Sequence, residues 1–296
     1  GVFAFFAMFA AFGIGNMVQS NSVADELYST FQIPFWVTGL VMSVFVSIVI
    51  IGGVKRIAKV ASKLIPIMAI TYVIAALIIV LINLDKIPGV IALIIESAFH
   101  GAAASGGFLG ATVWMAIRMG FARGIFSNEA GLGSAPIAHA AAKTNNPINQ
   151  GMIAMLGVFI DTIIICSLTA FVILLTGAFE SGAKGASMTS LAFSTALHGY
   201  GGYVVSFGLI LFAFTTILGW SYYGERCASY LFGIKIILFY RIFWIIATFI
   251  GAVIKLELVW IFADIANGLM ALPNLIALLL LSPVIFVKSR HYFSNR

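Results

Sequence analysis

The chain has 296 residues, of which 62% are hydrophobic and 9% charged, and its mean hydropathy is +1.11. A soluble protein carries about 25% charged residues, so this composition excludes a soluble globular fold and predicts a polytopic membrane protein. The net charge of +6 comes from basic residues in short segments between apolar stretches, which membrane topology explains better than nucleic-acid binding. The two cysteines, Cys166 and Cys227, lie in or beside apolar stretches and indicate neither a disulfide nor a metal site.

The apolar stretches predict about eight membrane-crossing helices, because one crossing needs about 20 residues. In chain order the expected helices are 1–23, 35–53, 63–83, 107–142, 148–177, 203–231, 235–254 and 258–287. The chain begins with Gly1 and is apolar from there on, so we expect a fragment that lacks earlier helices rather than a chain with a cleaved signal peptide.

Basic residues set the expected orientation. Lys and Arg concentrate after the second, fourth, sixth and eighth helices, so the positive-inside rule predicts that both ends of the fragment are cytoplasmic. Segments 84–106 and 178–202 then lie outside. Both are rich in Ala, Gly and Ser, and we expect short re-entrant or surface helices there that could act as lids.

A first polar cluster interrupts helix 1–23 in the sequence GIGNMVQ. Asn16 and Gln19 are three residues apart and therefore share one helix face. Their amides suit a zwitterionic ligand, but they equally suit hydrogen bonds between helices beside closely packed glycines. Both interpretations remain open from these residues alone.

The strongest interruption lies in the fourth expected helix. Residues 118–142 read RMGFARGIFSNEAGLGSAPIAHAAA, which places Asn128, Glu129, four glycines and a proline within a membrane-length segment. Glycine and proline break the helix here, and the backbone groups that they free need other partners in lipid. A ligand can be that partner, so we expect the functional site at this break.

Two features of this segment allow more than one interpretation. Gly120 and Gly124 form a GxxxG pair, which alone indicates close helix packing. Glu129 is an ionisable group whose insertion costs about 2.5–3.5 kcal/mol, so we expect it to be paired or functional. It could bind a cation, carry a proton, or pair with Arg118 or Arg123.

A third polar cluster lies in FAFTTILGW, residues 212–220, where Thr216 and Trp220 share a helix face. Hydroxyl oxygen suits a hard cation such as Na⁺, and an indole can wall a small pocket. Threonines that bond back to their own helix are the competing interpretation. Further polar residues fall within expected helices, of which we regard the last three as packing: Asp161, Thr162, Asp264, Asn267 and Asn274.

The segment 124–177, which begins GIFSNEAGLGSAPIAHAAAKTNNPINQG, closely resembles the sodium:alanine symporter family, also called the alanine or glycine:cation symporters. FGIGNMVQSNSVAD and TTILGWSYYGER are similar to further signatures of that family, and the resemblance covers essentially the whole chain. It implies a bacterial or archaeal inner-membrane transporter that couples uptake of alanine or glycine to Na⁺, sometimes to H⁺.

The same resemblance implies a fold. It is an all-α membrane protein with a LeuT-type core of two inverted five-helix repeats, each of which opens with an unwound helix. In a single transporter domain, 1–83 would then end the first repeat and 107–287 would form the second. The expected missing portion would contain the first unwound helix, so the fragment should hold only part of each site and should not transport alone.

Site residues also follow from the resemblance. The residues implied to contact or enclose the substrate are Asn16, Gln19, Phe126, Ser127, Asn128, Gly131 and Trp220. Trp220 would limit substrate size, and Thr215 and Thr216 fall where the fold's common sodium site takes its hydroxyl ligands. Glu129 and Asp161 receive no role.

The sequence therefore predicts Na⁺-coupled symport of alanine or glycine across a prokaryotic cytoplasmic membrane by alternating access. The expected partners are a small amino acid, Na⁺ and the lipid bilayer, with no cofactor and no nucleic acid. H⁺ coupling is the alternative, and a channel lined by the broken helix is the competing class. We do not expect an enzyme, because the chain contains no HExxH, no GxSxG and no cysteine–histidine grouping.

Overall fold

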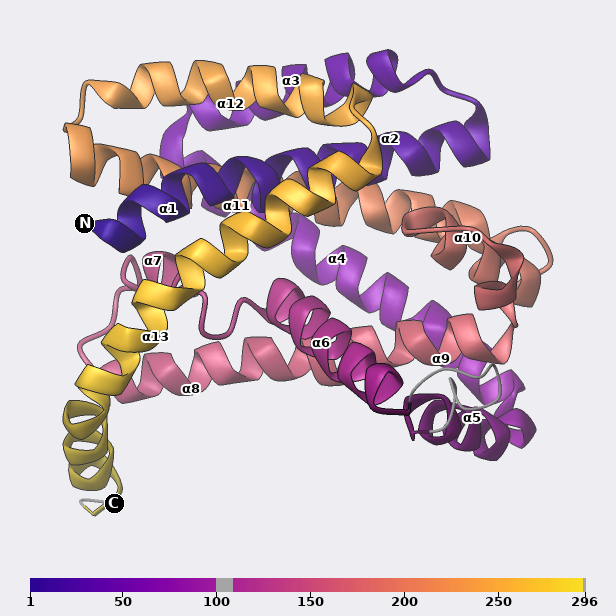
Figure 1. The fold of residues 1–296 in the computed structure, drawn as a ribbon. Helices are drawn as coiled ribbons and strands as arrows, with labels where there is room; N and C mark the ends of the chain where they lie inside the picture. The colour runs from indigo at the N-terminus through magenta and orange to yellow at the C-terminus, as the bar shows by residue number, and fades with distance from the viewer. Residues whose placement is uncertain (100–108, 295–296) are drawn as a thin grey trace.

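The computed structural model describes residues 1–99 and 109–294, and the regular elements of this part are all helices (Figure 1). Six helices within it are long and apolar enough to cross a membrane: Val2–Phe31, Gly53–Ile82, Pro147–Leu175, Gly201–Phe232, Ile236–Val253 and Glu257–Ser294. The prediction of a multi-pass α-helical membrane protein is therefore confirmed. Eight crossings remain a prediction, because the second expected helix has 17 residues and the fourth is broken.

The first expected helix is longer than predicted and is not a regular α-helix. It consists of α1 (Val2–Ala11), the π-helix η1 (Phe12–Met17) and α2 (Val18–Phe31), which follow one another without interruption. Gln32 ends it in a left-handed conformation, with φ of 55°. A π-turn holds one more residue than an α-turn, and such turns occur mostly at functional sites.

The next two helices meet at a pair of glycines. α3 (Phe35–Ile51) follows Pro34, and α4 (Gly53–Ile82) begins at Gly53, whose φ is 68°. The prediction that the third helix begins at 63 was wrong. The basic segment 55–63 is helical, because Lys and Arg are good helix formers and nothing in the segment breaks a helix after Gly53.

Short helices occupy both expected external segments. The first contains η2 (Leu84–Lys86) and α5 (Ile87–Phe99), while its residues 100–106 lie outside the described part of the chain. The second contains η4 (Ala178–Ser181) and α10 (Ala186–Ala196). Short helices are thus present in both segments, and their function as lids remains a prediction.

The fourth expected helix is broken, as predicted. α6 (Leu109–Asn128) and α7 (Ala135–His139) are separated by a six-residue turn in which Glu129, Gly131 and Gly133 have positive φ. The following span starts at Pro147 and consists of α8 (Pro147–Val158), the second π-helix η3 (Phe159–Cys166) and α9 (Ser167–Leu175).

The last three helices complete the core. α11 (Gly201–Phe232) packs against α1, α2, α4 and α10, while α12 (Ile236–Val253) packs against α3, and α13 (Leu256–Ser294) crosses diagonally in front of the N-terminal helix in Figure 1. The main apolar core joins η1, α11 and α12 around Ile14, Leu218 and Trp244, each at most 2% exposed.

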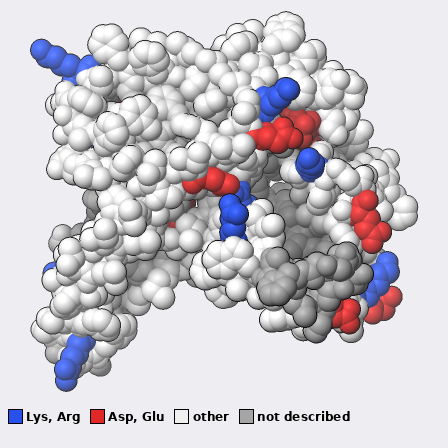
Figure 2. All heavy atoms as spheres, viewed as in Figure 1, with Lys and Arg blue, Asp and Glu red and all other residues white. Residues whose placement is uncertain are grey.

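Much of the remaining surface is apolar. Figure 2 shows few charged side chains on the face in view, separated by wide uncharged areas. Among the six spans, Pro147–Leu175 and Glu257–Ser294 are the least enclosed by other helices: only 11% and 6% of their most apolar 18-residue stretches are buried. Such exposed apolar helices require lipid or further protein around them.

Candidate functional site

The turn between α6 and α7 is held by side chains from its own ends and from α13. Asn128 Oδ1 accepts a hydrogen bond from Ala130 N at 2.9 Å, which turns the chain out of α6. Asn274 Nδ2 donates to Gly131 O at 2.9 Å. At Gly133 a Cβ atom would lie 2.7 Å from Asn274 and from Phe3, so only glycine fits. The break is therefore an ordered turn that is supported from two other helices.

Glu129 connects this turn to α11. Its Oε1 accepts a hydrogen bond from Trp220 Nε1 at 2.9 Å, and its Oε2 accepts one from Ser134 Oγ at 2.6 Å. Among the described residues it forms no ion pair, so the expected alternative of pairing with Arg118 or Arg123 was wrong.

Arg123 pairs instead with α13. Its Nη2 donates to both carboxylate oxygens of Asp264, at 2.5 and 2.6 Å, and its guanidinium lies 4.5 Å from the centre of the Trp260 ring. The Phe126 ring lies 4.8 Å from the same indole. Asp264, which we regarded as packing, is therefore an ionic partner, and Phe126 faces α13 at this contact.

Polar side chains also join the end of α6 to the π-helix η3. Ser127 Oγ donates to Asp161 Oδ2 at 2.7 Å, and Asn128 Nδ2 donates to Thr162 Oγ1 at 3.0 Å. Thr162 in turn donates to Asp161 Oδ2 at 3.0 Å. The polar residues predicted on two separate helices thus meet where one helix breaks and the other widens into a π-turn.

The turn around Glu129 and the polar contact between α6 and η3 border one cavity of about 640 Å³. Ser127, Asn128, Glu129, Gly131 and Asp161 line it, together with His139, Tyr223 and Asn274. Its lining contains two carboxylates but no Lys or Arg, so its electrostatic potential favours a cation or an ammonium group. Its volume is within the range of about 300–1,000 Å³ that is typical of small-molecule sites.

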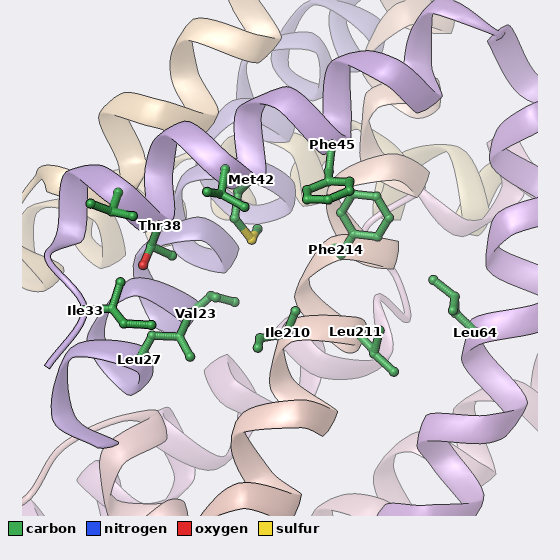
Figure 3. A pocket seen from close by; sticks show the side chains of 12 residues that line it. Val23, Leu27, Ile33, Thr38, Met42, Phe45, Leu64, Ile210, Leu211 and Phe214 are labelled. Atoms are coloured by element: carbon green, nitrogen blue, oxygen red, sulfur yellow. The ribbon is translucent and has the colours of Figure 1, made fainter. Parts of the chain in front are cut away.

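A different pocket, of about 400 Å³, lies between α2, α3, α4 and α11. Figure 3 shows Val23, Leu27, Met42, Phe45 and Phe214 around it. Thr38 is the one polar side chain of its lining, so a zwitterion would lose its hydration there for a single hydroxyl, which makes this pocket unsuitable for an amino acid. We therefore consider the polar cavity the candidate site.

The amides of the first cluster lie on and just after the π-helix η1. Gln19 Nε2 donates to Ile14 O at 3.0 Å and so occupies a carbonyl of the π-turn. Asn16 is fully buried, and its Nδ2 donates to Trp244 O at 2.8 Å. Asn16 Oδ1 has no hydrogen-bond partner among the described residues, so this buried amide oxygen can still accept a hydrogen bond.

Trp220 links this cluster to the break. A Cβ atom at Gly15 would overlap the Cβ and Cγ atoms of Trp220, so the indole packs directly on the backbone of η1. Its Nε1 points to Glu129. Residues 15, 129 and 220, which the sequence places in three separate helices, therefore form one contact chain.

The threonines of the third cluster lie away from the cavity lining. Thr215 is buried, and its Oγ1 donates to Leu211 O at 2.9 Å and to Phe212 O at 3.0 Å, which is the back-bonding interpretation. Thr216 is half-buried on the same helix. The structure thus joins Ser127, Asn128, Glu129, Gly131 and Asp161 in the cavity. The other predicted site residues do not belong to its lining: Asn16, Gln19, Phe126, Thr215, Thr216 and Trp220.

Apolar helices that break or widen around buried polar groups are typical of membrane transporters. The chain belongs to the sodium:alanine symporter family, whose model matches residues 1–296. This is a family of transporters, so the protein is not an enzyme.

Several curated proteins are similar over nearly the whole chain. An uncharacterized transporter of Haemophilus influenzae is 51% identical over 99% of the chain and 65% of its own length. The sodium/alanine symporter AgcS of Methanococcus maripaludis is 48% identical over 98% of the chain and 64% of its own length. The probable sodium/glutamine symporter GlnT of Bacillus subtilis is 40% identical over 95% of the chain and 59% of its own length. The chain thus spans less than two thirds of these relatives.

Proposed function

We propose that the protein functions as a Na⁺-coupled symporter of a small amino acid, alanine or glycine, in a cytoplasmic membrane. The observation that carries the proposal is the cavity at the break between α6 and α7, whose lining has two carboxylates and no basic residue. Family membership and the similarity to a sodium/alanine symporter support amino acid and cation as the transported pair.

The proposed architecture is the LeuT-type inverted repeat, with 1–83 in the first repeat, 107–287 in the second, and both ends of this chain cytoplasmic. The broken helix at the start of the second part supports it, because the first helix of each such repeat is discontinuous near the middle of the membrane. Alternating access would then move one group of helices against the other.

For the substrate, we propose the set named from the resemblance: Asn16, Gln19, Phe126, Ser127, Asn128, Gly131 and Trp220. The free Oδ1 of Asn16 supports this set, because a buried acceptor without a partner suits an ammonium group. The Trp220 indole supports a size limit, because it is 3% exposed and packed on Gly15.

For the coupling ion, we propose Na⁺ with hydroxyl ligands from Thr215 and Thr216. Coupling requires that Na⁺ and the amino acid each bind more tightly when the other is present, and this free energy is the same in both directions. H⁺ coupling is the second candidate, and the carboxylates of Glu129 and Asp161 in the cavity favour it.

The test is uptake of labelled alanine by the full-length protein in liposomes, under an inward Na⁺ gradient and under a matched K⁺ gradient. Saturable accumulation that needs Na⁺, and that glycine but not leucine inhibits, is the expected result. Uptake that follows a pH gradient without Na⁺ would establish the H⁺ alternative, and uptake that never saturates would indicate a channel. An alanine affinity that Na⁺ does not change would contradict coupling.

A further inference from the structure

The resemblance gives Glu129 no role, and the proposed function uses it only as one of the two carboxylates of the cavity. We propose that it is a positioning residue, whose carboxylate holds the Trp220 indole in the orientation that limits substrate size. The size limit rests on the proposed function, whereas the link between carboxylate and indole rests on the geometry of the break.

The contact engages both carboxylate oxygens. Trp220 Nε1 donates to Oε1 at 2.9 Å, and Ser134 Oγ donates to Oε2 at 2.6 Å. An indole has a single N–H donor, and a buried donor without an acceptor is destabilising. Glu129 supplies that acceptor to a side chain that is 3% exposed, across 91 positions of the chain. Ser134 fixes the carboxylate in turn.

The backbone gives an independent indication that this side chain is required. Glu129 ends α6 in the left-handed region, with φ of 56°. Glycine is the usual residue at such a helix end, because a Cβ atom is strained there. The other positive-φ positions of the turn, Gly131 and Gly133, are glycines. A glutamate at the remaining one is consistent with a carboxylate whose contacts offset the strain.

The opposite side of Trp220 is also constrained. The root of its side chain packs on Gly15 of η1, where no Cβ atom fits, and its ring meets Tyr223 edge to face at 5.4 Å. Packing therefore holds the root of the indole, and Glu129 holds its polar end. Because Asn16 follows Gly15 directly, this arrangement joins the break to the first polar cluster.

Positioning and charge make opposite predictions for one conservative variant. In Glu129→Gln, the amide oxygen can still accept from Trp220, and the amide nitrogen can donate to Ser134. Glu129→Ala removes both contacts. A positioning role therefore predicts that Gln is close to wild type, whereas binding a cation or carrying a proton through the carboxylate predicts that Gln behaves as Ala does.

The transport experiment uses the full-length protein in liposomes. Glu129→Ala should raise the KM for alanine about five- to tenfold, the equivalent of one hydrogen bond, with kcat within about twofold, and it should weaken discrimination against leucine. At saturating Na⁺, where a change in cation affinity does not enter, Glu129→Gln should keep the KM for alanine and the discrimination against leucine within about twofold of wild type. Trp220→Phe, which lacks the N–H, should match Glu129→Ala, and the double variant should lose no more than either alone.

Three results would overturn the proposal. These are a Gln variant as impaired as the Ala variant, an Ala variant with unchanged KM and selectivity, and single effects that add in full in the double variant. If Glu129→Ala does not fold, Glu129→Gln is compared with Trp220→Phe, and equal impairment of these two overturns the proposal. Absence of alanine uptake by the wild type is a failure of the proposed function alone.

A spectroscopic measurement tests the positioning role of Glu129 separately from the proposed transport function. The ¹⁵N indole resonance of Trp220 in detergent micelles is assigned by its loss in Trp220→Phe. It should shift in Glu129→Ala and remain near its position in Glu129→Gln. Ser134→Ala, which keeps the Trp220 contact, is the matched control. A resonance that does not move in Glu129→Ala overturns the proposal whether or not the protein transports alanine.

Discussion

Arg241 on α12 donates through Nε to Glu225 Oε2 on α11 at 2.7 Å, and the two side chains are 23% and 11% exposed. Beside them, Tyr240 OH donates to Met8 O on α1 at 3.2 Å. The ion pair therefore links α11 to α12, and the neighbouring tyrosine links α12 to α1. Its enclosed position makes the pair suitable for a stability test.

Glu225→Ala should lower the free energy of unfolding by about 3 kcal/mol, because it leaves the Arg241 charge without its partner in a poorly solvated place. Thermal unfolding in detergent measures the effect. The matched control is Glu257→Ala, whose partner Lys184 lies 4.0 Å away and whose side chain is 72% exposed, so less than about 0.5 kcal/mol should be lost. Equal shifts for the two variants would contradict the assigned difference.

Gly15→Ala should destabilise the protein by about 1–3 kcal/mol or prevent its folding, because the new methyl group overlaps the root of Trp220, which cannot rotate away. Gly120→Ala is the control. Outside its own stretch of helix, no described atom lies within 4 Å of a Cβ atom added at Gly120 or at Gly124, so the GxxxG pair is not closely packed against another described element. Alanine at this helical position should be neutral or stabilising by up to about 1 kcal/mol. A loss at residue 120 as large as at residue 15 would refute this prediction.

Trp220→Ala should allow transport of bulkier amino acids, because it removes the buried ring that we propose as the size limit of the substrate site. Competition of alanine uptake by leucine and glutamine measures the change, and about a tenfold improvement in their inhibition is expected. Trp36→Ala is the control, since that indole is 58% exposed on α3. Unchanged selectivity in Trp220→Ala would remove this residue from the substrate site.

Asp161→Asn should keep the fold, because an amide oxygen can still accept from Ser127 and Thr162, but it removes the carboxylate charge of Asp161 from the cavity. The half-saturating Na⁺ concentration should rise about tenfold, since a unit charge several ångströms away contributes roughly 1–2 kcal/mol at an effective dielectric constant of about 20. Glu180→Gln, on the exposed η4, should leave it unchanged. If Asp161→Asn instead abolished pH-driven uptake without altering the Na⁺ dependence, H⁺ coupling would be supported.

Composition and local sequence were enough to predict much of the fold. Apolar stretches located the spans, and the glycines and proline of 118–142 located the break, because both signals depend on neighbouring residues alone. The start of α4 was predicted ten positions too late, since its first turns carry the basic residues that we interpreted as a loop. Helix-forming charged residues at a membrane surface do not reveal where a span begins.

The contacts of the site were less predictable. Glu129 and Trp220 are 91 positions apart, and Asn16 and Trp244 are 228 apart, so no local pattern could pair them. The π-helices were also missed, because one inserted residue hardly changes the hydrophobic pattern of a long apolar span. Polar residues in such a span, as at Asn16 and Asp161, were the available signal.

The extra residue of η1 has a geometric consequence for everything that follows it in the first span. Each α-helical residue turns the chain by about 100°, so one residue more or less redirects every later side chain around the axis. If the residues Phe12–Met17 were wound as a regular α-helix without any deletion, α2 would be rotated by about that amount relative to α1. Asn21, whose Nδ2 donates to Gly251 O and Ile254 O, would then face away from α12. The π-turn therefore sets which side chains of α2 face α12, including Asn21.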